Sequence, residues 1–428
     1  MYICFNRMSF MKTQYLIISS IISLCSVFSY FSYHSKKLQP TVCVFVSSIF
    51  FVLLLNTLLP YFQLDQVSIR QLFSYIDFQD IVIDGILSYL LFAGSLHVCI
   101  KRFRSNISII LILAFFGTTV AVISTASLVY FLQHYFGGLP LFACLLFAAA
   151  VSPTDPVAVL AMLKKLDVSL DTKVCIAGES LLNDGVGIVF FTTFLSLTRY
   201  QSFDLVHMLH FFLHEVVGGL FLGFLIAQLS CFFLYRDQPY LLSKKDIVWS
   251  IGIVNITQVL SSLLGVNPAL ATVSLGLTVA YLIENISAKR QSGLLTFWDI
   301  IDELLNFILF FMAGLEFFHI VDVFYPVYVQ YATLAIGVAT LSRFLSVYMS
   351  TGIERFWYNR PIEDINIIAL GGIKGGLSLA LVKLIPNTLP GYQTVFIMTY
   401  SVVCFTMIVQ GLYIVRYIRL GELQKQVS

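Results

Sequence analysis

Five ionisable side chains fall inside stretches of this sequence that are otherwise apolar: Asp155, Glu179, Asp184, Arg343 and Lys374. A charged side chain within the hydrocarbon of a bilayer costs several kcal/mol unless it is paired or hydrated. These five residues are therefore the first candidates for a functional site.

The run GESLLNDGVGIVFF holds two pairs of polar residues at a spacing of four: Ser180 with Asp184, and Glu179 with Asn183. In a helix, residues four apart share a face, so the two pairs occupy adjacent faces about 100° apart. Hydrogen bonds between membrane helices average only about 0.6 kcal/mol, which is too little to explain a buried carboxylate. We expect the Asp184 face to bind an ion and the Asn183 face to brace it.

Two other apolar stretches contain residues that interrupt a helix. In SPTDPVAVLA, Pro153 and Pro156 each remove a backbone donor and clash with the preceding turn. The run GGIKGG weakens a helix by roughly 1 kcal/mol per glycine, at Gly371, Gly372, Gly375 and Gly376. Both stretches are predicted to be broken helices whose freed backbone groups need partners.

Oxygen atoms dominate the predicted site, which suits a small alkali cation such as Na⁺, with Li⁺ or K⁺ as alternatives. The expected ligands are the Asp184 and Asp155 carboxylates, the Ser180 hydroxyl and backbone carbonyls freed at Thr154. Burial disfavours the charged form of Asp184, so an empty site holds a proton that a cation must displace. This competition at one carboxylate predicts exchange of a cation for a proton, with no cofactor.

Asp155 and Lys374 have a second interpretation that the sequence leaves open. Helix N-termini carry partial positive charge and C-termini partial negative charge, so Asp155 and Lys374 could neutralise the ends of the broken helices without touching an ion. Arg343, in TLSRFLSVY, is expected to brace the bundle by pairing with an acidic residue.

The composition requires a membrane. Of the 428 residues, 58% are hydrophobic and 11% charged, whereas soluble domains carry about 25% charge. Apolar runs predict thirteen spans, so residues 1–428 form one all-α polytopic domain and no soluble domain remains. The predicted spans begin near residues 14, 40, 79, 107, 139, 173, 204, 246, 267, 297, 323, 363 and 392.

The two broken helices occupy matching places in two halves of the chain. The predicted first repeat covers about residues 14–200, a linking helix about 204–235, and the second repeat about 246–418. Each broken helix is the fifth span of its repeat, and the repeats enter the membrane from opposite sides. Paired interrupted helices in inverted halves indicate a transport site near the midplane.

The basic residues predict the orientation of the chain in the inner (plasma) membrane. With thirteen spans, eighteen Lys and Arg residues between Lys36 and Lys425 fall on one side. The other side receives only Arg7, Lys12, Arg70 and Arg199, and Lys383 near a span end. The positive-inside rule then predicts a cytoplasmic C-terminus and an N-terminus outside.

Other functions fit the residues less well. A net charge of +2 with dispersed basic residues gives no reason to expect nucleic-acid binding, and no catalytic triad, HExxH or phosphate loop indicates an enzyme. Eight scattered cysteines predict free thiols. A cation channel, a secondary transporter for another solute and a membrane sensor remain as alternatives to the exchanger.

Four segments resemble, in order and spacing, the bacterial sodium/proton antiporters of the NhaP type, which are related to eukaryotic sodium/proton exchangers. These segments are SPTDPVAVLAMLKKL, GESLLNDGVGIVFF, FWDIIDELLNFILFFMAGLEF and GGIKGGLSLAL. The resemblance implies a homodimer and a cation/proton antiporter fold with crossed discontinuous helices.

The resemblance also implies roles for individual residues. Asp184 is the ion- and proton-binding carboxylate, Asp155 and Thr154 belong to the unwound helix, and Ser180 is a ligand. Glu179 and Asn183 stabilise the site, and the Asn183-Asp184 pair implies electroneutral exchange. The family usually has Arg where Lys374 stands, so the expected pairing of Lys374 with Glu179 is less rigid.

Overall fold

The structure is a computed structural model of the chain. It describes residues 19–20, 22–32, 39–58, 78–132, 138–163, 166–200, 205–234, 244–284, 288–321, 326–356, 358 and 360–427.

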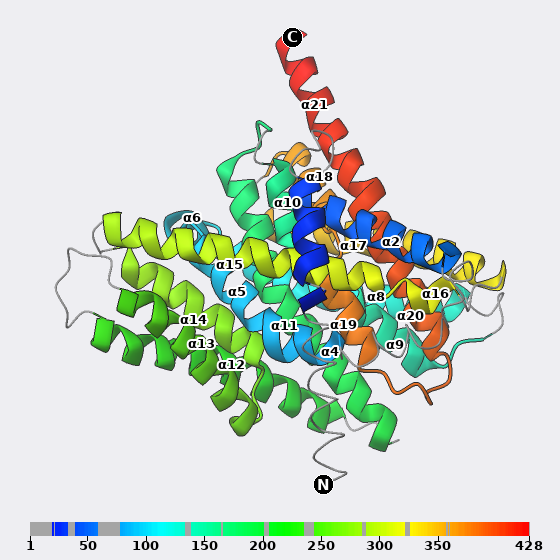
Figure 1. The fold of residues 1–428 in the computed structure, drawn as a ribbon, viewed down its shortest axis with the longest axis horizontal. Coiled ribbons are helices and arrows are strands. Elements are labelled where there is room, and N and C mark those ends of the chain that lie inside the picture. The colour runs from blue at the N-terminus through cyan, green and yellow to red at the C-terminus, as the bar shows by residue number, and fades with distance from the viewer. Residues whose placement is uncertain are drawn as a thin grey trace. The chain divides into compact units, whose positions relative to one another are not determined.

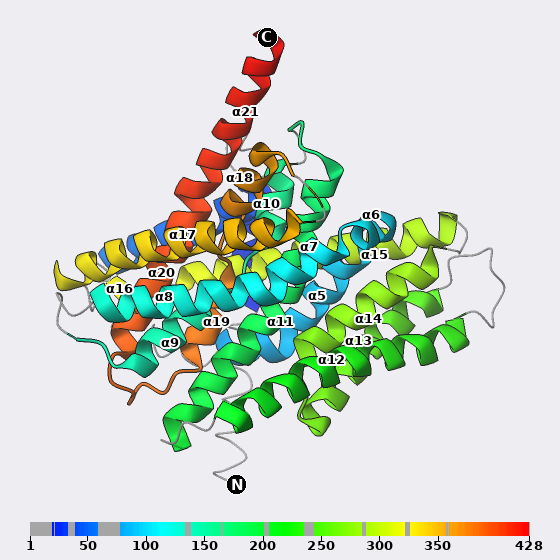
Figure 2. The ribbon, with the colours of Figure 1, turned by 180° about the vertical axis from the view of Figure 1, so that it is seen from behind.

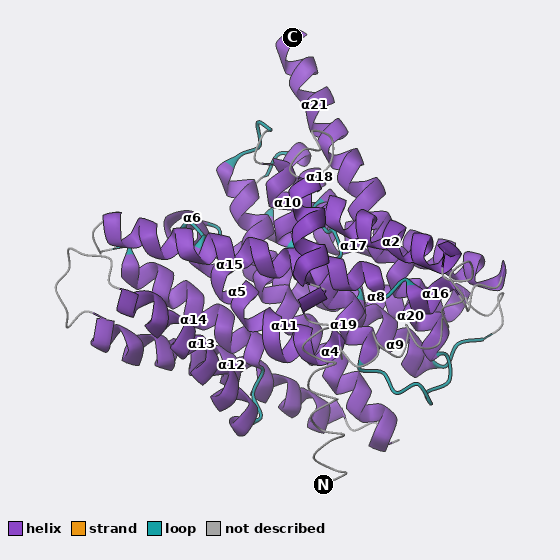
Figure 3. Cartoon of the chain, viewed as in Figure 1, coloured by secondary structure: helices purple, strands orange, loops and turns teal. Residues whose placement is uncertain are grey.

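Every regular element in the described part of the chain is a helix (Figures 1 and 3). In chain order these elements are α2 (Pro40–Leu58), α4 (Phe78–Asp80), η2 (Ile81–Ile86), α5 (Leu87–Leu96), α6 (Ile100–Ser105), α7 (Ile107–Leu111), η3 (Ile112–Gly117), α8 (Thr118–Leu132), α9 (Leu141–Ala150), α10 (Pro156–Leu163), α11 (Leu170–Tyr200), α12 (Leu205–Leu234), α13 (Lys244–Leu264), α14 (Pro268–Ile283), α15 (Ala288–Leu315), α16 (Phe318–Val321), α17 (Pro326–Glu354), α18 (Ile362–Leu370), α19 (Gly376–Lys383), α20 (Tyr392–Cys404), η5 (Phe405–Gln410) and α21 (Gly411–Val427).

The predicted span starts agree with the helices. Eleven of the twelve starts from 40 onward fall within three residues of an observed helix start. The exception is the tenth, predicted near 297, because α15 begins at Ala288 in a polar stretch that hydropathy assigns to a loop. The first predicted start, near 14, lies outside the described residues, although a short apolar helix covers Ile22–Ser32. Within the described residues, eight helices are long and apolar enough to cross a membrane.

Contacts divide the chain into two compact units. The first comprises residues 1–86 and 303–325, and its core packs aromatic rings of Phe28, Phe51 and Phe311. Gly314 lets α15 approach α2 closely, because a β-carbon there would lie 1.6 Å from Ser48 Oγ.

The second unit comprises residues 87–302 and 326–428 and contains all the predicted site residues. One of its cores surrounds Trp298, which packs edge-on against Phe92 at 4.8 Å and donates from Nε1 to Ser250 Oγ at 3.1 Å.

Helices α12 and α14 of this unit touch backbone to backbone. A β-carbon on Gly223 would lie 1.9 Å from the Ala271 carbonyl oxygen, and one on Gly219 would lie 2.8 Å from the Asn267 carbonyl oxygen. Small residues four apart are the usual means of close helix approach in membranes. These glycines therefore fix α12 against the first turns of α14.

Helix α11 is the most enclosed of the long apolar helices. In its most apolar stretch 83% of residues are buried, against 22–67% in the seven others of the described part. It contacts α9, α10, α14, α18 and α19, so it meets both segments that were predicted to be broken (Figure 2). The polar residues of GESLLNDG are thus carried into the interior of the unit.

Candidate functional site

Both predicted helix breaks are present, and they touch each other. Helix α9 ends at Ala150 and α10 begins at Pro156, while α18 ends at Leu370 and α19 begins at Gly376. The backbone N–H of Asp155 in the first break donates to the Ile373 carbonyl in the second, at 2.7 Å. Two unwound segments more than 200 residues apart in sequence thus form one crossing.

Thr154 joins the first break to α11. Ser180 Oγ donates to the Thr154 carbonyl at 2.8 Å, and the two hydroxyl oxygens lie 2.6 Å apart. Asn183 Nδ2 donates to Thr154 Oγ1 at 3.0 Å. Since Ser180 gives its proton to the carbonyl, the Thr154 hydroxyl is the donor between the two oxygens. Both faces of the predicted helix therefore converge on this one threonine.

Asp184 lies beside the crossing and is 9% exposed. Its electrostatic neighbours are Asp155, Lys374 and Glu179, and the backbone of Thr154 lies against its carboxyl group. The glycine that follows it is pressed against the side chain of Leu270, since a β-carbon on Gly185 would lie 2.4 Å from Leu270 Cγ. The structure thus gathers the four predicted ligand residues around one point.

Asp155 serves two helix ends. Its Oδ1 accepts from the backbone N–H groups of Val157 at 2.9 Å and Ala158 at 3.4 Å, which makes it the N-cap of α10. Its Oδ2 lies against Gly375, where a β-carbon would be 2.9 Å away, directly before α19. A carboxylate between two helix N-termini offsets their partial positive charge. This geometry supports the dipole interpretation of Asp155.

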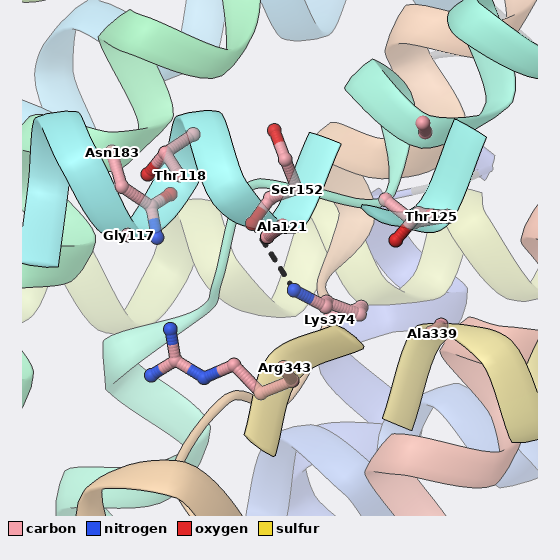
Figure 4. Close-up of a pocket in the computed structure, with 11 residues that line it drawn as sticks. Gly117, Thr118, Ala121, Thr125, Ser152, Asn183, Ala339, Arg343 and Lys374 are labelled. Carbon is pink, nitrogen blue, oxygen red and sulfur yellow. Dashed lines mark hydrogen bonds between the residues drawn. The ribbon is translucent and has the colours of Figure 1, made fainter. Parts of the chain in front are cut away.

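Lys374 has the complementary position (Figure 4). Its Nζ donates to the Ser152 carbonyl at 3.1 Å, just beyond the C-terminus of α9 at Ala150. Its backbone N–H donates to Thr406 Oγ1 at 3.1 Å in η5. The ammonium group therefore neutralises a helix C-terminus, as the dipole interpretation of Lys374 predicts.

Glu179 pairs with Arg343, so the expected pairing of Lys374 with Glu179 is wrong. Arg343 Nη2 donates to Glu179 Oε2 at 2.9 Å, and Nη1 donates to Oε1. The planar guanidinium reaches both carboxylate oxygens, whereas the Lys374 side chain points toward Ser152. The prediction that Arg343 braces the bundle through an acidic partner is confirmed.

The end of α18 is capped by two side chains. Arg343 Nη2 also donates to the Ile368 carbonyl at 3.1 Å, and Gln410 Nε2 donates to the Leu370 carbonyl at 2.7 Å. Gln410 and Thr406 both lie in the π-helical segment η5. Sequence reasoning missed these two residues; the signal that could have found Gln410 is its place as a lone amide in the run VVCFTMIVQGLY.

A small pocket of about 10 Å³ lies beside the Asn183 face, between α8, α17 and the crossing (Figure 4). Asn183 Oδ1 and Arg343 Nε are buried there, and neither atom has a hydrogen-bond partner in the described part of the chain. Lys374, Ser152 and Thr118 also line the pocket. The pocket is large enough for one water molecule, which could donate to Asn183 Oδ1 and accept from Arg343 Nε.

Comparisons with known proteins agree with this architecture. A family model described as sodium/hydrogen exchanger, transmembrane, matches residues 20–420. The chain is 30% identical over 420 residues to the Na(+)/H(+) antiporter NhaP of Pseudomonas aeruginosa, covering 95% of this chain and 97% of that protein. It is also 30% identical over 370 residues to the Na(+)/H(+) antiporter NhaG of Bacillus atrophaeus, covering 82% of this chain and 65% of that one.

Among solved structures, the sodium proton antiporter MjNhaP1 from Methanocaldococcus jannaschii at pH 8 is similar to this chain with a TM-score of 0.76. The alignment covers 95% of this chain and 99% of that one at 16% sequence identity. The arrangement of helices is therefore shared.

Proposed function

The chain belongs to the sodium/hydrogen exchanger family of multi-pass membrane transporters, and we propose that it exchanges Na⁺ for a proton across the membrane by alternating access. In this proposal the two ions compete for Asp184. Thr154, Ser180 and Asp155 supply further oxygen atoms for the cation, and Glu179, Asn183 and Lys374 stabilise the site.

The observation that carries the proposal is that the three carboxylates of the site, Asp155, Glu179 and Asp184, have different partners. Asp155 is held by two backbone N–H groups and lies between two helix ends. Glu179 is held by both terminal nitrogens of Arg343. Within the described residues, Asp184 has no ion pair with an arginine and caps no helix; its carboxyl group meets the Thr154 backbone, with Lys374 among its charged neighbours. A buried carboxylate without its own paired arginine or helix end can bind either a proton or a cation.

Electroneutral exchange is the mode that the site supports best. The residue before Asp184 is Asn183, a neutral amide whose Nδ2 is bonded to Thr154. A single exchangeable carboxylate at this position carries one cation one way and one proton the other, so no net charge moves. Asp in the place of Asn183 would add a second titratable group.

The orientation and assembly of the chain are also proposals. The distribution of basic residues supports a cytoplasmic C-terminus and an N-terminus outside, in the inner membrane. We expect a homodimer, as the resemblance of the sequence to this family implies.

The test is proton movement in proteoliposomes after addition of Na⁺, Li⁺ or K⁺. The wild-type protein should move protons against the cation, and the isosteric variant Asp184→Asn should not. Glu284→Gln, at an exposed carboxyl group just after α14, is the matched control and should behave as the wild type. Cation-driven proton movement that survives in Asp184→Asn would overturn the assignment.

Two further measurements test the finer parts of the proposal. Clamping the membrane potential with valinomycin and K⁺ should leave the Na⁺-driven proton movement unchanged, because electroneutral exchange does not respond to voltage. Lys374→Arg keeps the positive charge beside Ser152 and changes its shape, so it shows whether lysine tunes the pH range of exchange.

A further inference from the structure

Glu215 is a carboxyl side chain inside α12 that the crossing does not use. It is ten residues beyond Leu205, so at 1.5 Å per residue it lies about 15 Å along a 30-residue helix. Its surroundings in the sequence, LHFFLHEVVGGLFLGF, are apolar apart from histidine. The candidate membrane span within α12 runs from Leu209 to Ser230, so Glu215 lies six residues from one end of it. A carboxylate within such a span is costly and is retained where it has a partner or an ion to bind.

Asn267 holds this carboxyl group at the start of α14. The Asn267 Oδ1 accepts from the Leu270 backbone N–H at 3.0 Å and caps the helix, while the Asn267 side chain also hydrogen-bonds the Glu215 carboxyl group. The Asn267 backbone N–H donates to the Glu215 carbonyl at 3.3 Å. Because its Oδ1 is committed to the cap, Asn267 meets Glu215 through its NH₂ group.

The same turn of α14 connects Glu215 to the main site. Leu270, whose N–H is capped by Asn267, is completely buried and packs on Gly185, the residue after Asp184. Asp184 is buried, whereas Glu215 is half-buried. One turn of α14, from Asn267 to Leu270, therefore lies between the residue that holds the half-buried Glu215 and the residue that packs beside Asp184.

We propose that Glu215 is a second cation-binding carboxylate of this protein, which draws Na⁺ or another monovalent cation to α14 before it reaches Asp184. The inference rests on the proposed exchange at Asp184 and adds a residue that sets the apparent affinity for the cation. The Gly219 and Gly223 contacts hold α12 on α14, so the Glu215 carboxyl group keeps its place beside Asn267.

The experiment measures Na⁺-driven proton movement in proteoliposomes over a series of Na⁺ concentrations at one pH. Glu215→Gln keeps the size and the hydrogen-bonding capacity of the side chain but removes its charge. The Na⁺ concentration for half-maximal rate should rise about tenfold, because a neutral amide no longer attracts a cation to the start of α14. The maximal rate should stay within about twofold, since Asp184 is intact.

Glu215→Asp restores the charge and should bring the half-maximal Na⁺ concentration back toward the wild-type value. Glu284→Gln, which removes a carboxyl group at the other end of α14, should leave it unchanged. Where Glu215→Gln is not recovered folded, Glu215→Ser removes the charge with a small polar side chain and should give the same rise.

Asp184→Asn, measured beside these variants, separates the two proposals. Loss of exchange in Asp184→Asn together with an unchanged half-maximal Na⁺ concentration in Glu215→Gln overturns the role of Glu215 and leaves the exchange site standing. A lower maximal rate in Glu215→Gln at unchanged apparent affinity assigns Glu215 only to the structure of the α12–α14 contact, which also overturns the proposal.

Discussion

The carboxylate of Asp155 fills the space that any side chain at position 375 would need. A β-carbon on Gly375 would lie 2.9 Å from both Cβ and Oδ2 of Asp155. The two broken helices therefore approach each other where Gly375, before α19, meets the side chain of Asp155, before α10. This close contact places one negative charge at the N-termini of α10 and α19 together.

Gly375→Ala should displace Asp155 from the α10 N-terminus. We expect a loss of about 1–2 kcal/mol of stability, the scale of a lost N-cap, together with weaker Na⁺-dependent exchange. Thermal unfolding of the purified protein and transport in proteoliposomes measure the two effects. Gly337→Ala in α17, where a β-carbon would meet nothing within 4 Å, is the control and should be neutral or slightly stabilising. Equal behaviour of the two variants would contradict the contact.

The Glu179–Arg343 pair should behave as a buried ion pair. Removing one charge by Glu179→Gln or Arg343→Met leaves the other unpaired, and each variant should lose about 3–5 kcal/mol. The double variant should be less unstable than the sum of the two, because no unpaired charge remains. A double-mutant cycle on thermal unfolding measures this coupling, and additive effects would show that the pair is not coupled. Arg343→Lys should be intermediate, since a lysine cannot donate to both carboxylate oxygens at once.

Thr154 should be needed for its hydroxyl group rather than its shape. Thr154→Val removes the group that accepts from Asn183 and donates to Ser180, at a cost of about 1–3 kcal/mol for the unsatisfied partners. We expect Thr154→Val to weaken both stability and apparent Na⁺ affinity. Thr154→Ser keeps the hydroxyl and should retain most of both. Transport over a Na⁺ series distinguishes them, and full activity of the valine variant would remove Thr154 from the site.

Gly223→Ala should disrupt the second unit, because the new β-carbon would lie 1.9 Å from the Ala271 carbonyl oxygen. The clash is with main-chain atoms of Ala271, which cannot rotate away as a side chain can, so α12 must move. We expect a loss of several kcal/mol or failure to accumulate in the membrane. Gly252→Ala in α13 has open space around its β-carbon and provides the comparison. If both variants accumulate and melt alike, the close packing of α12 on α14 is wrong.

The sequence predicts the fold well where hydropathy and helix breakers act alone. Pro153 and Pro156 end a helix whatever surrounds them, and the four glycines of GGIKGG do the same, so both breaks were predictable. The spacing of Ser180 and Asp184 likewise identifies a helix face without tertiary information. These local rules do not depend on which helix becomes the neighbour.

Partnerships across the fold were less predictable. Glu179 could pair with Arg343 or Lys374, and only the three-dimensional course of α17 puts the guanidinium beside the carboxylate. The sequence gives no sign of the role of Glu215, because this residue lies outside both broken helices and its partner, Asn267, belongs to another helix and is uncharged. Thr406 and Gln410 act through a π-helical turn that the sequence does not reveal.

The packing of α14 has different mechanical properties on its two sides. Toward α12 the backbones interlock at Gly223 and Ala271, so sliding would drive a carbonyl oxygen into a neighbouring main chain. Toward α11 the closest approach is that of the branched Leu270 side chain to the bare Gly185, with the Leu270 backbone nitrogen next to it. An apolar tip on a surface without a side chain has no directional bonds to break. If α11, which carries Asp184, slides along α14 during a transport cycle, the apolar contact between Leu270 and Gly185 allows the movement without breaking hydrogen bonds. This contact lies one residue away from the carboxylate.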